Sequence, residues 1–214
     1  MSFRARLRSS GVLTGALGAV WIAAVCAGLV FMQSYASRPG LAATPPGRWP
    51  RVSRLERARD RPTLVMLLHP GCPCSRASVE ELDRVLAHAP RVPAVHLVFF
   101  RPREVPDGWE RTDLWQRAAA IPGVRLWRDD DGVEATRFGA ATSGQVLLYD
   151  TSGALVFSGG ITPSRGHEGD NAGRDTVVAL LAGQHAGTGR TPVFGCSLRD
   201  PDRAPADPPV TDGL

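Results

Sequence analysis

Two cysteines separated by one proline, Cys72 and Cys74, are the residues of this sequence best suited to chemistry. They lie between an apolar run, TLVMLL at residues 63 to 68, and a segment at 75 to 88 whose apolar residues recur at helical spacing. The N–H groups in the first turn of a helix stabilise negative charge, so a thiol placed there ionises readily. The pattern therefore predicts a redox site or a soft-metal site.

A disulfide within this pair would close a small ring. In an extended chain, the Cα atoms of residues two positions apart are about 6.5 to 7 Å from each other, which is the outer limit for a disulfide. We expect such a bond to need a tight turn and to be easily reduced. The alternative is a structural disulfide or two inert buried thiols, because cysteine is among the most buried residue types.

A third cysteine, Cys196, follows the apolar stretch Val193 to Gly195, which can dock against a folded domain. Cys196 could serve the pair as a resolving thiol, form a disulfide with one member and leave the other free, or complete a metal site. A thiol that is merely packed in the domain is the alternative. His69, three positions before Cys72, could donate a hydrogen bond to the thiolate or bind a metal, or it could simply close the strand.

A second histidine, His167, lies in the polar loop SRGHEGDN at residues 164 to 171. Glu168 or Asp170 could orient its ring for proton transfer, and Arg165 could hold an anion or a carboxylate. The alternative is a turn network in which Asp170 or Asn171 caps the helix that follows.

The N-terminus carries a predicted membrane span. Residues 11 to 32 are 22 consecutive positions without a charge, enough to cross the roughly 30 Å hydrocarbon core of a bilayer as a helix. Arg4, Arg6 and Arg8 precede this segment, so the positive-inside rule places residues 1 to 10 in the cytoplasm and the rest outside. We expect an uncleaved signal anchor, with a cleaved signal peptide as the competing interpretation.

This topology gives a single-pass protein of the cell membrane with a soluble domain on the extracytoplasmic, periplasm-facing side. Cys26 falls within the span and is expected to act as a small apolar residue. The other three cysteines would then lie in an oxidising compartment, where an odd number of thiols requires an explanation.

Charge excludes one class of partner. All 25 basic residues are arginine, and three of them precede the span, where there is no acidic residue. The exported part thus carries 22 arginines against 21 acidic residues, so nucleic-acid binding has no electrostatic support. The arginine-rich stretch at 48 to 61 is the exception, and we expect it to be a solvated stalk or a first helix near anionic headgroups.

The soluble part is expected to hold one domain. We assign residues 33 to 59 to a linker or stalk, 60 to 198 to the domain and 199 to 214, rich in Pro and Asp, to a disordered tail. Within the domain, strands alternate with helices, and a turn beginning with Asp150 and ending with Gly153 predicts a late hairpin. The predicted strands are 63–69, 94–100, 124–127, 145–149 and 154–157, and the predicted helices are 75–88, 112–120 and 174–181, with 135–138 as a connecting segment. This order predicts an α/β domain with a mixed sheet covered on both faces.

These residues carry a resemblance. Over residues 60 to 185, the strand ending in HPG, the cysteine pair opening a helix, and the late hairpin followed by a helix resemble the thioredoxin fold. The combination of HPGCPCSRAS at 69–78, GITPSRGHEGDNAGRD at 160–175 and VFGCSL at 193–198 is similar to the membrane-anchored thioredoxin-like proteins called RedB. The resemblance implies a three-layer sandwich and a redox role. It also implies that Cys72 attacks and Cys74 resolves.

Two departures from ordinary thioredoxins are evident. Their motif is Cys-x-x-Cys, whereas here Pro73 alone separates the thiols. Thioredoxins also place a cis-proline facing the thiols at the start of the late hairpin, where this chain has ATSGQ at 141 to 145. The missing proline puts substrate presentation in question and favours metal capture.

Two functions follow as expectations. The first is a membrane-anchored thiol–disulfide oxidoreductase without a cofactor, in which Cys72, Cys74, Cys196, His69 and His167 form the site. Its partners would be protein thiols or disulfides, or a membrane redox protein. The second is a non-enzymatic Cu(I) chaperone, in which Cys72, Cys74 and Cys196 or His69 bind copper.

Overall fold

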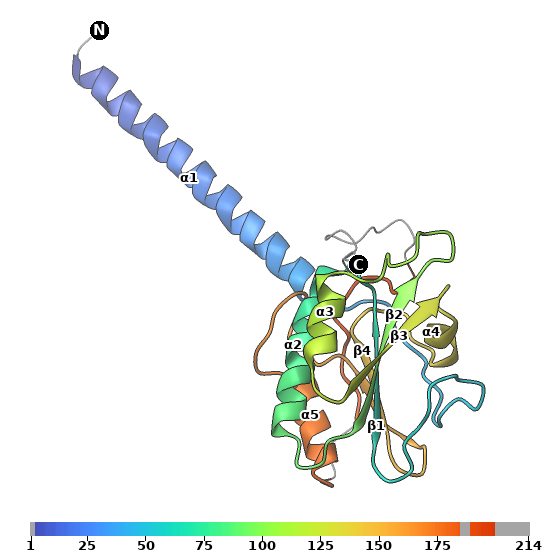
Figure 1. Ribbon diagram of the computed structural model, residues 1–214. Helices are drawn as coiled ribbons and strands as arrows, with labels where there is room; N and C mark the ends of the chain where they lie inside the picture. Colours follow the sequence, from blue (N-terminus) through green and yellow to red (C-terminus); the bar gives the residue numbers. More distant parts are fainter. Residues whose placement is uncertain (1–2, 185–188, 200–214) are drawn as a thin grey trace. The chain divides into compact units, whose positions relative to one another are not determined.

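A computed structural model describes residues 3–184 and 189–199, and the predicted disorder of the tail falls on residues outside this description except for Arg199 (Figure 1). The chain divides into two units, Met1–Ser37 and Arg38–Leu214. The first unit is helix α1, Phe3–Ala36. Its part from Leu13 to Ala36 is long and apolar enough to cross a membrane, and large apolar side chains such as Trp21 and Leu29 are exposed along it. A helix that is apolar all round suits a lipid environment.

The second unit is built on a five-stranded mixed sheet. The strands are β1 (Thr63–Leu68), β2 (Ala94–Arg101), β3 (Val124–Asp130), β4 (Gln145–Tyr149) and β5 (Leu155–Gly159), in the order β3-β2-β1-β4-β5. Strands β1, β2 and β3 pair in parallel, whereas β4 pairs antiparallel to both β1 and β5. Strand β1 is buried throughout, which explains its unbroken apolar sequence.

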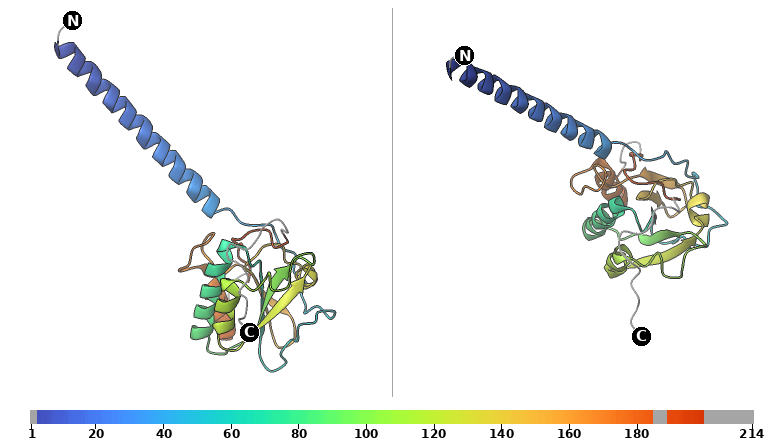
Figure 2. Two further views of the ribbon diagram at one scale, coloured as in Figure 1. Left: turned by 45° about the horizontal axis from the view of Figure 1, so that its top comes forward. Right: turned by 90° about the horizontal axis from the view of Figure 1, so that it is seen from above.

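Helices cover the two faces of this sheet unequally. Helices α2 (Pro73–His88), α3 (Asp113–Ala120) and α5 (Ala172–Leu181) lie on one face, and the short α4 (Val133–Arg137) lies on the other (Figures 1 and 2). Alternate residues of β1 divide between two cores, with Leu64, Met66 and Leu68 under the three helices and Val65 and Leu67 on the α4 side. The predicted α/β fold with a mixed sheet covered on both faces is confirmed.

The segment that follows the first unit differs from the expected linker. Residues 38 to 59 pack on the domain and complete the α4 side of the core, and residues 48 to 61 form no helix. Trp49 makes edge-on contacts with Phe138 and Tyr149, at ring-centroid distances of 5.1 and 5.2 Å, and Leu55 is 3% exposed. These two apolar residues interrupt the arginines and take part in the core, so the arginines around them form its outer surface.

Replacing Leu55 tests whether this segment belongs to the folded unit. We expect Leu55→Ala to lower the free energy of unfolding by about 2 to 4 kcal/mol, because it empties a buried site. Val52→Ala, in the same segment and 71% exposed, should change it by no more than about 0.5 kcal/mol. Urea denaturation measures both, and equal effects would mean that the segment is a free stalk.

Candidate functional site

Helix α2 begins at the cysteine motif. Cys72 is its N-cap residue, with extended backbone angles (φ −92°, ψ 114°), and Pro73 occupies the first helical position. Proline is well suited to that position, because its missing N–H would have no partner in the helix anyway. The helix therefore starts two residues earlier than predicted and places Cys74 inside its first turn.

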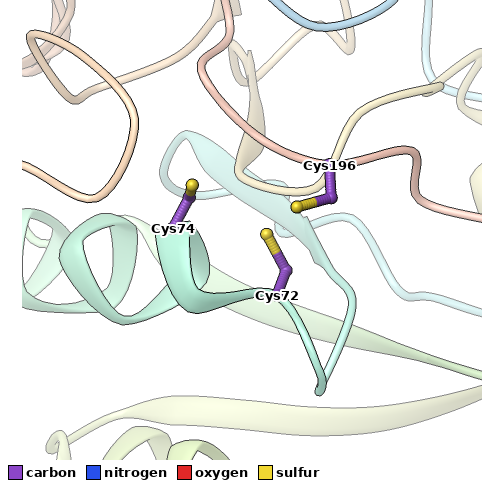
Figure 3. A group of neighbouring side chains, drawn as sticks. All are labelled: Cys72, Cys74 and Cys196. Atoms are coloured by element: carbon purple, nitrogen blue, oxygen red, sulfur yellow. The ribbon is translucent and has the colours of Figure 1, made fainter. Parts of the chain in front are cut away.

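The three cysteines expected in the site do come together. The sulfur atoms of Cys72, Cys74 and Cys196 all lie within 4.8 Å of one another, and each residue is less than a tenth exposed. All three are thiols, with no disulfide between them. Figure 3 shows Cys72 and Cys74 on the start of α2 and Cys196 on the C-terminal segment facing them, with the sulfurs of Cys72 and Cys196 pointing toward each other.

Hydrogen bonds to its sulfur lower the pKa of Cys72 far below the ordinary value of 9.0. The largest contribution comes from the side chain of Cys196 and the next from that of Cys74, while burial acts in the opposite direction. The backbone N–H of Cys196 and the hydroxyl of Ser75 add two further hydrogen bonds. These hydrogen bonds favour the ionised form of Cys72.

The pKa of Cys74 moves in the opposite direction. The side-chain hydrogen bond with Cys196 lowers it, but the hydrogen bond to Cys72, burial and the negative charge of Cys72 together raise it above 9.0. Arg165 contributes a favourable charge to Cys74. The pKa values of the two thiols of the motif are thus shifted in opposite directions, which suits one of them to attack and the other to resolve.

Two buried serines, which we did not predict as site residues, link the motif to the loop before β4. Ser75 Oγ lies 2.7 Å from Ser143 Oγ, which in turn accepts a hydrogen bond of 2.7 Å from the backbone N–H of His69. Ser143 can therefore donate to Ser75, whose single hydroxyl hydrogen can go either to the sulfur of Cys72 or to the backbone oxygen of His69, 3.4 Å away. Serine at a helix start is common as a cap, so its residue type gave no signal of this role.

We expect Ser75→Ala to raise the pKa of Cys72 by about one to two pH units, because a hydrogen bond to a charged group is worth about 1.5 to 3 kcal/mol. A titration followed by the ultraviolet absorbance of the thiolate measures this shift. Ser78→Ala is the matched control, since Ser78 is equally buried on the next turn of α2 but donates to the backbone oxygen of Cys74. An unchanged titration in Ser75→Ala would remove Ser75 from the site.

The segment that carries Cys196 is held against residues 141 to 143. Thr142 and Ser197 form an antiparallel bridge, flanked by hydrogen bonds from Ser143 N–H to Cys196 O and from Leu198 N–H to Ala141 O, both 2.9 Å. This is the position where the resemblance places the cis-proline of thioredoxins. The backbone of residues 141 to 143 therefore takes part in the site although no proline is present.

His69 lies beside the motif but is packed as a strand-closing residue. It is fully buried, its Nδ1 accepts a hydrogen bond of 3.0 Å from Gly71 N–H, and its ring stacks on Phe100 and meets Trp109 edge-on. Among the described residues, the possible metal-ligand atoms that lie within 4.8 Å of one another are the sulfurs of the three cysteines, and no nitrogen of His69 belongs to this group. This geometry favours a positioning role over metal binding.

The side chains of the loop at residues 164 to 171 do not have the arrangement expected for proton transfer. His167 is exposed, and its Nδ1 lies 2.7 Å from Arg165 O. Glu168 and Asp170, expected to orient this ring, pair instead with Arg84 (2.6 Å) and Arg174 (2.8 Å). Asn171 caps α5 by accepting from Arg174 N–H, so the alternative of a turn network describes this loop well.

No protein-family model and no curated protein matches this sequence. Solved structures do match it. A hypothetical protein from Sinorhizobium meliloti is 24% identical with a TM-score of 0.51, covering 64% of this chain and 79% of its own. An uncharacterized conserved protein from Geobacillus kaustophilus is 19% identical with a TM-score of 0.54, covering 78% and 94%. A secreted disulfide oxidoreductase from Mycobacterium tuberculosis, described as homologous to E. coli DsbE, is 18% identical with a TM-score of 0.36, covering 57% and 81%.

The strand order decides the fold. Strands β2 and β1 are parallel, β4 and β5 are antiparallel, and the cysteines open the helix after β1. The domain has a thioredoxin-like fold. Strand β3, paired in parallel with the outer side of β2, adds a fifth strand to this thioredoxin-like arrangement. At these identities the first two solved structures support the fold alone.

Proposed function

We propose that the protein is a membrane-anchored thiol–disulfide oxidoreductase of the RedB-like type. The observation that carries this proposal is the meeting of three cysteine sulfurs within 4.8 Å of one another at the start of α2, where Cys72 is the N-cap residue. A thiolate is the form that attacks a disulfide, and a neighbouring thiol is needed to release the product.

The exchange proceeds in two balanced steps. The Cys72 thiolate attacks one sulfur of a partner disulfide, forms a mixed disulfide and releases the other partner sulfur as a thiolate. Cys74 or Cys196 then loses its proton to that thiolate and attacks the Cys72 sulfur, which frees the partner as a dithiol. The protein has lost two electrons to the partner, and the reverse sequence oxidises a partner dithiol.

The surrounding residues have supporting roles in this proposal. His69 positions the motif through its backbone bond to Ser143, and Arg165 favours the charge that Cys74 acquires when it attacks. We leave His167 out of the reaction because it is exposed and contacts the backbone of Arg165. Helix α1 is the proposed anchor, and the arginines before it support an extracytoplasmic domain.

The exchange of a small aromatic disulfide by the reduced protein tests this function. We expect Cys72→Ser to slow the release of the aromatic thiol by a factor of at least about 100, because the hydroxyl that replaces the thiolate does not attack sulfur. Cys26→Ser, on α1, should react like the parent. Equal rates for the parent and Cys72→Ser would end the redox proposal.

A Cu(I) carrier is the second candidate, with copper as its cargo. Three thiol ligands within 4.8 Å suit this soft ion, and the lowered pKa of Cys72 favours the ionised form that binds it. We expect one Cu(I) per chain in equilibrium dialysis under reducing conditions, and its loss in Cys72→Ser and Cys196→Ser. Binding that survives both changes would discard the carrier while leaving the redox proposal intact.

A further inference from the structure

The segment from Val193 to Leu198 lies on the site through one antiparallel bridge, between Thr142 and Ser197, with a bend at Gly195. Its two hydrogen bonds with residues 141 to 143 are those of an antiparallel pair, and they set Cys196 directly opposite Cys72 (Figure 3). A cysteine next to such a bridge, with its sulfur facing the attacking cysteine, is the geometry that a mixed-disulfide complex with another protein would require. The chain therefore supplies its own occupant for that position.

The contact depends on a glycine. A Cβ atom on Gly195 would lie 2.0 Å from the backbone oxygen of Ser143, so any side chain at this position would push the segment away from residues 141 to 143. The close approach is thus a property of this one residue, and a single substitution can weaken the pairing.

Besides this pairing, the segment is held by a hydrogen bond of 2.8 Å from Gly40 N–H to Val193 O and by Leu198, which is buried in the α4-side core. Its surroundings are nevertheless incompletely filled. A cavity of about 250 Å³ lies beside the segment, lined by residues 39 to 43 and 190 to 193, among others. Gln145, 1% exposed, also lines it, and its Oε1 has no hydrogen-bond partner. An unsatisfied buried oxygen costs free energy, and here that cost falls at the start of β4, next to the segment.

We propose that residues 193 to 198 are a displaceable internal strand, and that an extended cysteine-bearing segment of a partner protein replaces them on residues 141 to 143. This inference rests on the proposed function. It adds the kind of partner and the way in which access to Cys72 is controlled. While the internal strand is in place, the backbone groups of Ala141 and Ser143 are occupied. Once it leaves, the partner's cysteine takes the place of Cys196, and Cys196 can return later as the resolving thiol.

The chemistry is the first exchange step with a defined partner. The Cys72 thiolate attacks the cysteine sulfur of the partner's disulfide, a sulfur–sulfur bond forms between them, and the second sulfur leaves with the electron pair. No electrons are gained or lost overall in this step, and no further reactant is needed.

The test uses a peptide that copies the internal strand. The peptide VFGCSLR, the sequence of residues 193 to 199, carries its cysteine as a mixed disulfide with thionitrobenzoate, whose release is followed by absorbance. With the full-length reduced protein, we expect the rate of thionitrobenzoate release to reach a plateau at high peptide concentration. The height of this plateau is set by the opening of the internal strand. Gly195→Ala should raise that plateau roughly tenfold, since it removes about two backbone hydrogen bonds.

Gly47→Ala is the matched control. Nothing lies within 4 Å of a Cβ at Gly47, so its plateau should equal that of the parent. Melting curves of both glycine variants show whether they are folded. If the folded Gly195→Ala protein has the same plateau as the parent, the proposal is overturned, because the internal strand would then be no obstacle to the peptide.

Methylated peptides test the docking directly, and they are used with the parent protein. Methylation of the leucine nitrogen, which copies the Leu198 donor, should slow capture roughly tenfold, whereas methylation of the preceding serine nitrogen should leave it nearly unchanged. Equal rates for the two peptides would show that no strand pairing occurs. The proposed function fails in a different way, namely if Cys72→Ser captures the peptide as fast as the parent.

Discussion

Oxidation of the purified protein should join Cys72 to Cys196, and the oxidised protein should be more stable than the reduced one. The two sulfurs point toward each other from separate elements, whereas Cys72 and Cys74 occupy the N-cap and the second position of one helix (Figure 3). A bond to Cys196 also closes a much longer loop. For a loop of more than about 100 residues, the gain in the free energy of unfolding is about 4 to 5 kcal/mol.

Mass mapping of alkylated peptides before and after reduction identifies the bond, and thermal unfolding measures the gain. Cys196→Ser should show no increase in melting temperature on oxidation, whereas Cys74→Ser should keep it. Recovery of a Cys72–Cys74 bridge, with Cys196 alkylated in the oxidised protein, would contradict the prediction and assign the redox couple to the motif alone.

The stability of the reduced protein should depend on pH through Cys72. Hydrogen bonds from Cys196 and Cys74 hold its pKa below the ordinary value of 9.0, so the folded protein has a thiolate where the unfolded chain has a thiol. Unfolding at neutral pH therefore takes up a proton. The free energy of unfolding should rise with pH by up to about 1.4 kcal/mol per pH unit until it levels off above the unfolded value, and this stabilisation is lost as the pH falls toward the folded pKa.

Urea denaturation of the reduced parent and of Cys72→Ser, on both sides of neutral pH, measures this contribution. The slope should be smaller in Cys72→Ser by the amount that Cys72 contributes. Cys74, whose pKa is raised, affects stability only above its ordinary value and does not distort this range. Parallel pH profiles for the two proteins would mean that Cys72 is protonated in the fold.

The sequence was sufficient to predict the strands of the sheet and the cysteine motif at the start of α2. Strand β4 has its predicted bounds, and β1, β2 and α3 differ from the prediction by a single residue, because buried strands and amphipathic helices have clear periodicity. Helix α4 was missed since five residues are too few to show a helical period. Residues 38 to 59 were expected to be part of a linker because the two apolar residues that pack in the core give no periodic pattern among the arginines around them.

The site itself could be predicted only in part. Cys72 and Cys74 are close in the sequence, but the position of Cys196 depends on the bridge between Ser197 and Thr142, which no local pattern reveals. Ser143 likewise reaches the motif only through the pairing of β1 with β4. The density of charged residues around His167 indicated a site, whereas in the structure those charges pair with arginines on α2 and α5.

The internal strand also determines which thiols can compete at Cys72. A thiol held beside its target on the same chain acts at a high effective concentration, of the order of millimolar or far above. Once Cys72 is in a mixed disulfide, small thiols in the surrounding solution would have to exceed that concentration to attack its sulfur before Cys196 does. Cys196 therefore keeps the second step of the exchange within the protein, so that release of the partner does not depend on thiols from solution.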